Sequence, residues 1–475
     1  MSIQRPLVQR HKKLARTLLY LAPVAIWFVA EPAIRELGDL GIRNDWAKID
    51  YDEYESFRLL RDYLRIDSSY PDGNEIPAVE FLAEQLEKEG IEAHIQRLGV
   101  RNANLWATLE GANPRPLVLH QHVDVDPVLS PELWQAPPFA AEYRAPHVVG
   151  RGAFDMKSVG IAQLMAVLEL RRSGVRLNRS VKILATGDEE RDSFLGTQRV
   201  LAEHPEWART FWAVLTEGGA VEALSAEEVK YWGTEFQQKR FVVVWVCSSD
   251  RQRLEDLRKS VHFRGTERRL TETVRIFFPR YGPSRARSVT RELLASPDTI
   301  LESIRTFPRE LEAAEFPPLL EAHLRDQSYA FPVEEDPEGG YRFQLVVHLL
   351  PDSDFDIVFE KLVGDSMDGF QYVVENYNEK VPPSPIDHPV FQAIDEGVSR
   401  LHPGVDHGPL FLAWSATDAR YFREVGIPSY GFSPFLLVSQ DSQSSKGPNE
   451  RIPAPAFIAG VQLYEDVVRR LVAED

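Results

Sequence analysis

The spacing of apolar positions along the chain predicts alternating helices and strands from about residue 50 onward. A first apolar face recurs at helical spacing and ends at Gly90; its members are Val79, Phe81, Leu82 and Leu86. Short continuous apolar runs at 117–119, 181–185 and 212–215 each predict a buried strand, and a second helical face covers 159–173. This order predicts an α/β fold, with a layered, mostly parallel sheet and helices on both faces.

The middle of the chain has a different pattern. It begins with a predicted strand at 241–246, continues through helical stretches rich in Arg and Glu, and reaches a second strand at 343–350. After Pro382 the first pattern resumes and ends in a helix near 456–472. We therefore expect a smaller α+β domain, residues 240–380, inserted between two parts of a larger domain, residues 46–239 and 381–475.

Residues 1–45 form a basic N-terminus followed by an apolar run from Thr17 to Ala30. This charge order is typical of a secretory signal or a signal anchor, although the run is shorter than the roughly 20 residues of a spanning helix. Cleavage needs paired small residues, but Ala30 is paired with Phe28. We expect an uncleaved membrane anchor with the rest of the chain on the extracytoplasmic side. The alternative is an amphipathic or buried N-terminal helix.

Composition narrows the chemistry. The formal net charge of −18 opposes binding to a phosphate backbone, so nucleic acid is not an expected partner. Cys247 is the only cysteine, which excludes an intramolecular disulfide and a zinc site built from several thiolates. Any metal ligands must therefore be His, Asp and Glu.

Candidate ligands follow the predicted strands. The first strand is followed by His122 and Asp124, the second by Glu189 and Glu190, and the third by Glu217, while Asp155 precedes the helix at 159–173. A carboxylate commonly accepts the second N–H of a metal-bound imidazole, and Asp124 is spaced to do so for His122. Taken singly, each residue is more often a surface or helix-capping residue. Together they occupy one predicted sheet edge, where open α/β sheets bind ligands.

Six motifs in order resemble one enzyme family. They are His120-Gln-His-Val-Asp124, Gly150-Arg-Gly-Ala-Phe-Asp-Met-Lys157, Gly187-Asp-Glu-Glu190, Thr216-Glu-Gly-Gly219, Ala416-Thr-Asp-Ala-Arg420 and Lys446-Gly-Pro-Asn-Glu450. Their order and spacing resemble the zinc metallopeptidase family of aminoacylase, acetylornithine deacetylase, succinyl-diaminopimelate desuccinylase and glutamate carboxypeptidase. The resemblance covers about residues 50–235 and 385–475.

The resemblance implies a site with two zinc ions bridged by Asp155. His122 and Glu217 would hold one ion, Glu190 would hold the other, and Glu189 would be the general base. The implied reaction is hydrolysis of an amide or peptide bond next to a carboxylate, in a peptide or an N-acyl amino acid. The inserted domain would act as a lid, and two copies of the chain could pair through it.

The sixth motif departs from the family, because Lys446 stands where a histidine ligand is expected. A protonated lysine has no lone pair for a metal. In one interpretation its ammonium neutralises Glu190 and leaves one zinc on His122, Asp155 and Glu217. In the other, catalysis is lost and the protein binds a peptide-like ligand or a partner.

The inserted domain also departs from the family. The stretch Cys247–Leu254 lacks the histidine that the family uses across a dimer, and the strand counterpart of a substrate-binding arginine offers His348 instead. Other histidines are possible substitutes, although each is more typical of an ordinary structural residue; they are His262, His323, His388, His402 and His407. The leading hypothesis is a zinc-dependent amidohydrolase or peptidase, and the alternative is the silent relative.

Overall fold

The computed structural model describes residues 49–474 apart from 72, 224–228, 286–317, 378, 438 and 443. The predicted anchor at 1–45 lies outside these residues. Within the described part of the chain, no helix is long and apolar enough to cross a bilayer. The signal anchor therefore stays a prediction.

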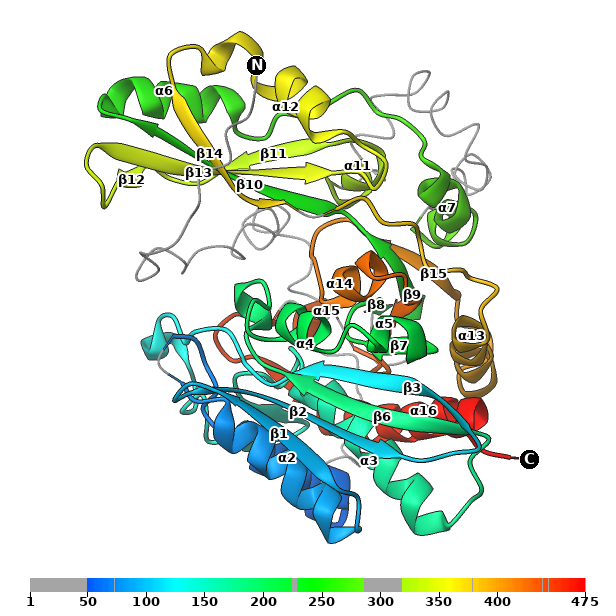
Figure 1. The fold of residues 1–475 in the computed structure, drawn as a ribbon. Coiled ribbons are helices and arrows are strands. Elements are labelled where there is room, and N and C mark those ends of the chain that lie inside the picture. Colours follow the sequence, from blue (N-terminus) through cyan, green and yellow to red (C-terminus); the bar gives the residue numbers. More distant parts are fainter. Residues whose placement is uncertain are drawn as a thin grey trace.

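The larger part of the molecule is built on a sheet that has nine strands within the described residues, in the order β1-β2-β6-β3-β7-β16-β9-β15 with β8 beside β9 (Figure 1). Its strands are β1 (Ala93–Leu98), β2 (Asn102–Leu109), β3 (Asn113–His122), β6 (Arg179–Thr186), β7 (Ala213–Thr216), β8 (Ala220–Ala223), β9 (Val229–Gln238), β15 (His407–Leu412) and β16 (Ser429–Gly431). The four central strands, from β6 to β16, are parallel. Antiparallel strands flank them, because β2 runs against β6 and β9 runs against β16.

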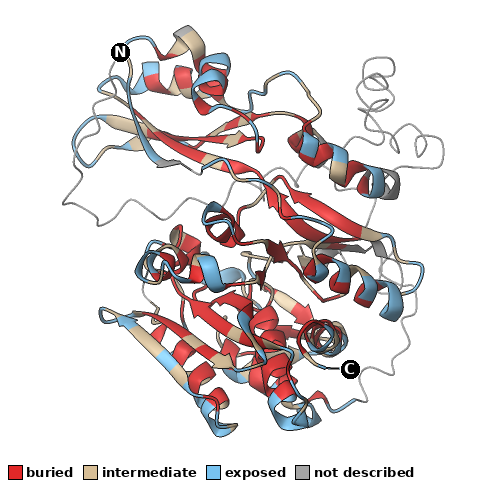
Figure 2. Ribbon diagram, turned by 45° about the vertical axis from the view of Figure 1, so that its right-hand side comes forward, coloured by how far each residue is buried: buried red, intermediate tan, exposed pale blue. Residues whose placement is uncertain are grey.

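Helices cover both faces of this sheet. One face carries α1 (Glu55–Leu64), α2 (Ile76–Lys88), α3 (Lys157–Ser173), α13 (Pro389–Leu401) and α16 (Ala454–Val472), and the other carries α4 (Thr197–Glu203), α5 (Trp207–Thr210) and α14 (Ala419–Glu424). Strand alternation supplies both cores, since Leu117 and Leu119 pack in the first and Val118 in the second. Figure 2 shows the buried residues concentrated on these strands. The predicted α/β fold is confirmed.

The second sheet is antiparallel and lies apart from the first (Figure 1). Its strands are β10 (Arg240–Ser248), β11 (Gln327–Ala330), β12 (Glu334–Glu335), β13 (Tyr341–Leu349) and β14 (Gln371–Tyr377). Helices α6 (Arg251–Val261) and α12 (Phe355–Val363) join it in a separate apolar core. In contrast, α7 (Glu272–Arg285) and α11 (Pro318–Leu324) pack into the first core, where α7 contacts β15.

Short elements complete the fold. Strands β4 (Glu142–Arg144), β5 (His147–Val149) and β17 (Arg451–Pro453) form a third sheet, which ties the end of the Lys446 motif to the segment before Arg151. The one-turn helices are η3 (Tyr51–Glu53), η4 (Pro131–Leu133), η5 (Glu189–Arg191), η6 (Gly364–Met367) and α15 (Ser439–Ser442).

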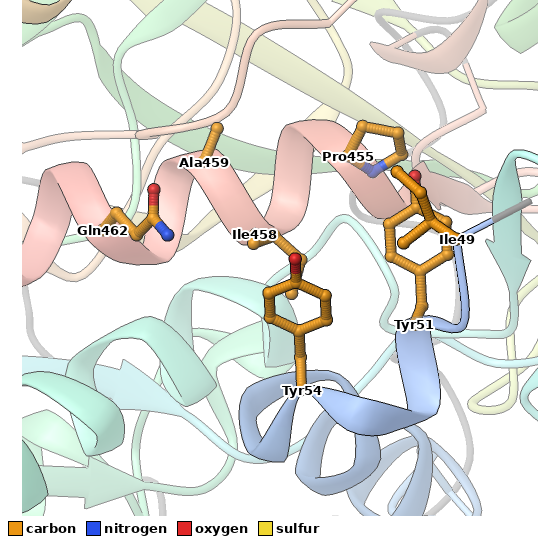
Figure 3. A pocket seen from close by; sticks show the side chains of 7 residues that line it. All are labelled: Ile49, Tyr51, Tyr54, Pro455, Ile458, Ala459 and Gln462. Carbon is orange, nitrogen blue, oxygen red and sulfur yellow. The ribbon is translucent and has the colours of Figure 1, made fainter. Parts of the chain in front are cut away.

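A shallow surface pocket lies between α16 and the start of the described chain (Figure 3). It is lined by Ile49, Tyr51, Tyr54, Pro455, Ile458, Ala459 and Gln462. None of these side chains is a carboxylate or an imidazole, so the pocket offers no ligand set for a metal.

Candidate metal-dependent active site

Three adjacent strand ends bring the candidate ligands together. His122 is the last residue of β3, Glu189 and Glu190 form the η5 turn after β6, and Glu217 follows β7 directly. Since β3 pairs in parallel with both β6 and β7, their carboxyl ends meet at one edge of the sheet. These candidate residues therefore meet at one edge of the sheet, and their role as ligands stays a prediction.

The imidazole of His122 is oriented toward the carboxylates. Its Nδ1 lies 2.9 Å from the backbone oxygen of Asp124, to which it donates a hydrogen bond. The opposite nitrogen, Nε2, lies 3.1 Å from Asp155 Oδ1 and 3.6 Å from Glu217 Oε2. Both ring nitrogens face acceptors, so in this structure Nε2–H donates to Asp155 Oδ1. When Nε2 loses its proton and Nδ1–H stays on the Asp124 oxygen, its lone pair is directed at the space shared with the two carboxylates, as in a metal-binding histidine.

Asp124 supports the turn that carries the glutamates. Its carboxylate accepts the backbone N–H groups of Glu189 at 3.1 Å and Glu190 at 3.0 Å. Its Oδ1 lies 3.6 Å from His122 Nδ1, farther than the backbone oxygen that accepts the imidazole proton. Asp124 thus orients His122 mainly through its main chain and fixes Glu189 and Glu190 through its side chain.

Asp155 lies between His122 and Lys446. The N-cap of α3 is Met156 rather than Asp155, so this carboxylate is not a helix cap. Its Oδ1 faces His122, and its Oδ2 lies 3.4 Å from Lys446 Nζ. The backbone N–H of Asp155 donates to Glu450 Oε1 at 3.0 Å, which ties it to the sixth motif.

Lys446 faces the oxygen of Asp155 that His122 does not contact. Its ammonium donates a hydrogen bond to Glu190 Oε2 and lies 3.5 Å from Asp126 Oδ2. Asp126 was not among the predicted site residues, although it lies two residues after Asp124 and follows the same strand. The alternation of His122, Asp124 and Asp126 was the available signal.

The protonation equilibria reflect burial among like charges. Burial raises the pKa of Glu189 well above its ordinary value, and the Glu217 carboxylate adds to the shift. Burial also raises the pKa of Glu217, to about 7, with a further contribution from Asp155. Burial alone would lower the pKa of His122, but Glu217, Asp124 and Asp155 outweigh it and raise the pKa.

The donor set fits a divalent cation. Two groups of three described residues could hold an ion, because the ligand atoms within each group all lie within 4.8 Å of one another. One group is His122, Asp155 and Glu190, and the other is His122, Glu189 and Glu217. Within the described residues, Glu189 Oε1 and Glu190 Oε1 are buried without a hydrogen-bond partner. Buried, unpaired carboxylate oxygens beside an imidazole lone pair are expected ligands of an ion such as zinc.

A second layer of buried polar groups supports the site, and most of it was not predicted. His120 lies between the hydroxyls of Thr216 and Thr186, at 2.8 and 3.0 Å, and Asp418 accepts a hydrogen bond from Thr197 at 2.7 Å. Asp418 belongs to a recognised motif, but the motif does not specify its partners.

Glu75 is a further supporting residue and lies far from the motifs in the sequence. Its Oε1 accepts the backbone N–H of Asp188 at 3.1 Å, and burial raises its pKa to about 8. No local pattern around residue 75 identified this role.

The six histidines considered as substitute ligands have structural contacts elsewhere. His323 Nε2 lies 2.9 Å from the Phe411 oxygen, His348 packs on Phe241, and His262 Nδ1 accepts from Ala330 N. In the larger part, His388 accepts from Val390 N, His402 packs on Trp232, and His407 contacts Ser399. Within the described residues, His122 is the one imidazole in the metal-binding groups.

A layered α/β sheet that carries an imidazole and several buried carboxylates at its carboxyl edge is typical of metal-dependent hydrolases. The family model described as "Peptidase family M20/M25/M40" matches residues 118–470. The chain therefore belongs to this metallopeptidase family, whose members are metal-dependent hydrolases.

Individual relatives are similar to this chain over nearly its whole length. Aminoacylase-1A of Rattus norvegicus is 25% identical over 438 residues, which cover 89% of this chain and 96% of that protein. An M20 metallo-carboxypeptidase from Sulfolobus solfataricus superposes with a TM-score of 0.66 at 17% identity, over 88% of this chain and 99% of the other. A dinuclear metal binding peptidase from Bacillus subtilis gives 0.52 at 12% identity, over 89% and 98%. These structures support the shared fold.

Proposed function

We propose that this protein is a metal-dependent amidohydrolase or peptidase that cleaves the amide bond of an N-acyl amino acid or a short peptide. The observation that carries this proposal is that His122 Nε2 lies 3.1 Å from Asp155 Oδ1 and 3.6 Å from Glu217 Oε2. Glu189 can place a carboxylate oxygen beside His122 and Glu217. Support for the substrate class comes from the names of its relatives, an aminoacylase and a carboxypeptidase.

Three residues would hold the ion in this proposal. His122 contributes the Nε2 lone pair, and Asp155 and Glu217 contribute carboxylate oxygens. A bound zinc ion supplies a Lewis acid that polarises an amide carbonyl and acidifies water. Asp124 keeps the His122 proton on Nδ1 through its backbone oxygen, so Nε2 stays available.

Glu189 is the proposed general base. Its carboxylate is buried, and Oε1 has no hydrogen-bond partner among the described residues, so it is free to accept a proton. The raised pKa of Glu189 suits a group that takes a proton from the attacking water and then gives it to the leaving nitrogen. Asp124 holds this carboxylate in place by accepting its backbone N–H.

The test is a hydrolysis screen of the full chain, loaded with zinc, against N-acyl amino acids and dipeptides. We expect turnover that falls by about 10²–10⁴-fold in Glu189→Gln while bound zinc is unchanged, because the general base is lost and the ligands remain. Zinc binding without turnover of any tested substrate would favour the silent, ligand-binding alternative. The absence of zinc binding would refute the metal site itself.

Anchoring of the N-terminal segment in a membrane and an extracytoplasmic location remain part of this proposal. They rest on the basic and apolar pattern of residues 1–30. Pairing of two copies through the inserted domain is likewise proposed from the resemblance. Alkaline carbonate extraction of expressing cells tests the anchor, since a peripheral protein would be released and an anchored one would stay with the membrane.

A further inference from the structure

We propose that the ammonium of Lys446 replaces the second metal ion of the site, so that each chain binds a single divalent ion on the His122 side. This inference rests on the proposed function, since it assumes that the His122 side binds metal. It concerns a different group of atoms, namely Lys446 with the carboxylates of Glu190, Asp126 and Asp155.

The ammonium of Lys446 is surrounded by three carboxylates. Lys446 Nζ donates to Glu190 Oε2 and lies 3.4 Å from Asp155 Oδ2 and 3.5 Å from Asp126 Oδ2. An ammonium has three donors and no acceptor, so it can satisfy carboxylates but cannot ligate a metal. One positive charge therefore already occupies the side of the cluster that Glu190 faces.

The environment keeps this charge in place. The Glu190 side chain is 1% exposed and that of Lys446 19%, so water screens their attraction poorly. A divalent ion placed beside the ammonium would meet like-charge repulsion and would compete with it for the same oxygens.

The backbone around Lys446 directs its side chain inward. The Lys446 oxygen accepts a hydrogen bond from Arg151 Nη2 at 3.1 Å, and Arg151 Nη1 pairs with Glu450 Oε2 at 2.7 Å. The other oxygen of Glu450 accepts the N–H groups of Phe154 and Asp155. Lys446 is thus fixed to the same segment that presents Asp155, unlike a solvated surface lysine.

The Glu190 side also lacks an imidazole of its own. Within the described residues, the possible ligand group that contains Glu190 consists of Glu190, Asp155 and His122, and the group of Glu189 and Glu217 uses the same imidazole. His388, His402 and His407 are engaged with Val390, Trp232 and Ser399. A second ion would consequently have carboxylates and an ammonium as neighbours, which is a poor donor set for zinc.

The experiment is a count of bound zinc by elemental analysis. The full chain is stripped with a chelator, loaded with excess zinc chloride and freed of unbound ion by gel filtration. We expect one zinc per chain in the wild type and two in Lys446→His, which restores a ligand. The matched control is Lys361→His, which adds a histidine at an exposed position of α12 and is expected to leave one zinc.

Cobalt provides a second readout that needs no variant. Electron paramagnetic resonance of the wild-type chain titrated with cobalt should show an isolated ion that saturates at one equivalent. Two zinc ions in the wild type, spin-coupled cobalt, or one zinc in a folded Lys446→His variant would overturn the inference and leave the proposed function standing. No bound metal would instead overturn the proposed function.

Discussion

The His122 side and the Lys446 side of the acidic cluster share Asp155 but differ in what faces it. On the first side Nε2 of an imidazole faces Asp155 and Glu217, and on the second an ammonium contacts Asp155 and Glu190. An imidazole can give up its Nε2 proton and bind a metal ion, whereas an ammonium has no lone pair to offer. Similar carboxylates can therefore serve as metal ligands at one side and as partners of a fixed charge at the other.

The largest difference between the two sides is expected in zinc affinity, when His122 or Glu190 is replaced. His122→Ala is expected to weaken zinc binding by more than about 100-fold, because even partners one layer beyond the ligands usually contribute about 10–100-fold. Glu190→Gln should change the affinity by less than about 10-fold, since Glu190 is engaged by Lys446. Competition with a chromophoric chelator measures both constants. Equal losses in the two variants would make Glu190 a metal ligand.

The buried Arg151–Glu450 ion pair beside Lys446 is expected to contribute strongly to the free energy of unfolding. Arg151→Met leaves the Glu450 carboxylate, which is 1% exposed, without its cation. Loss of one partner of a buried pair costs about 3–5 kcal/mol in the free energy of unfolding. The matched control, Arg144→Met, breaks a pair that is 40% and 43% exposed and should cost less than about 1 kcal/mol. Urea unfolding compares the variants, and equal costs would show that the buried pair has no special weight.

The core of the second sheet should matter for stability but not for metal binding. Leu345 is fully buried in β13, so Leu345→Ala is expected to cost about 2–4 kcal/mol through a cavity. Zinc affinity measured under native conditions should stay unchanged, because the ligands belong to the first sheet. A parallel loss of zinc would show that the two sheets are coupled at the site.

Lys239 offers a smaller contrast with Lys446, because it is buried without a carboxylate hydrogen-bond partner in the described structure. Its ammonium donates to the Arg325 oxygen, and burial lowers its pKa to about 7. The unfolded chain then binds more protons between pH 7 and the ordinary lysine pKa, so stability should rise with pH by about 1 kcal/mol per unit there.

Urea unfolding of the wild type and Lys239→Met between pH 7 and pH 8.5 isolates this contribution. The wild type should gain more stability than the variant over that interval. Identical slopes would mean that Lys239 keeps its ordinary pKa in the folded state.

The sequence predicted the fold and the convergence of the candidate ligands at one sheet edge because both depend on local patterns. Apolar runs such as 117–119 predicted the central strands, and the residues after them fell at one sheet edge. Contacts between segments far apart in the sequence could not be predicted in this way. Glu75 reaches Asp188 across 113 positions, and the partners of Asp418 come from a different strand connection. Such pairs depend on how helices and loops pack, which no spacing along the chain records.

Asp124 illustrates a finer difference. Its spacing correctly brought it next to His122, but the backbone oxygen rather than the carboxylate makes the shorter contact with the imidazole. The carboxylate instead accepts two N–H groups from the η5 turn. The spacing of Asp124 predicted that it lies beside His122, while the geometry of the turn determined which of its atoms contacts the imidazole.

Anomalous diffraction at the zinc edge from crystals of the zinc-loaded chain would locate every bound ion. One strong peak is expected among His122, Asp155 and Glu217, with the Lys446 side chain still directed at Glu190. A second strong peak beside Glu190, with Lys446 turned away from it, would show that the ammonium does not replace the second ion.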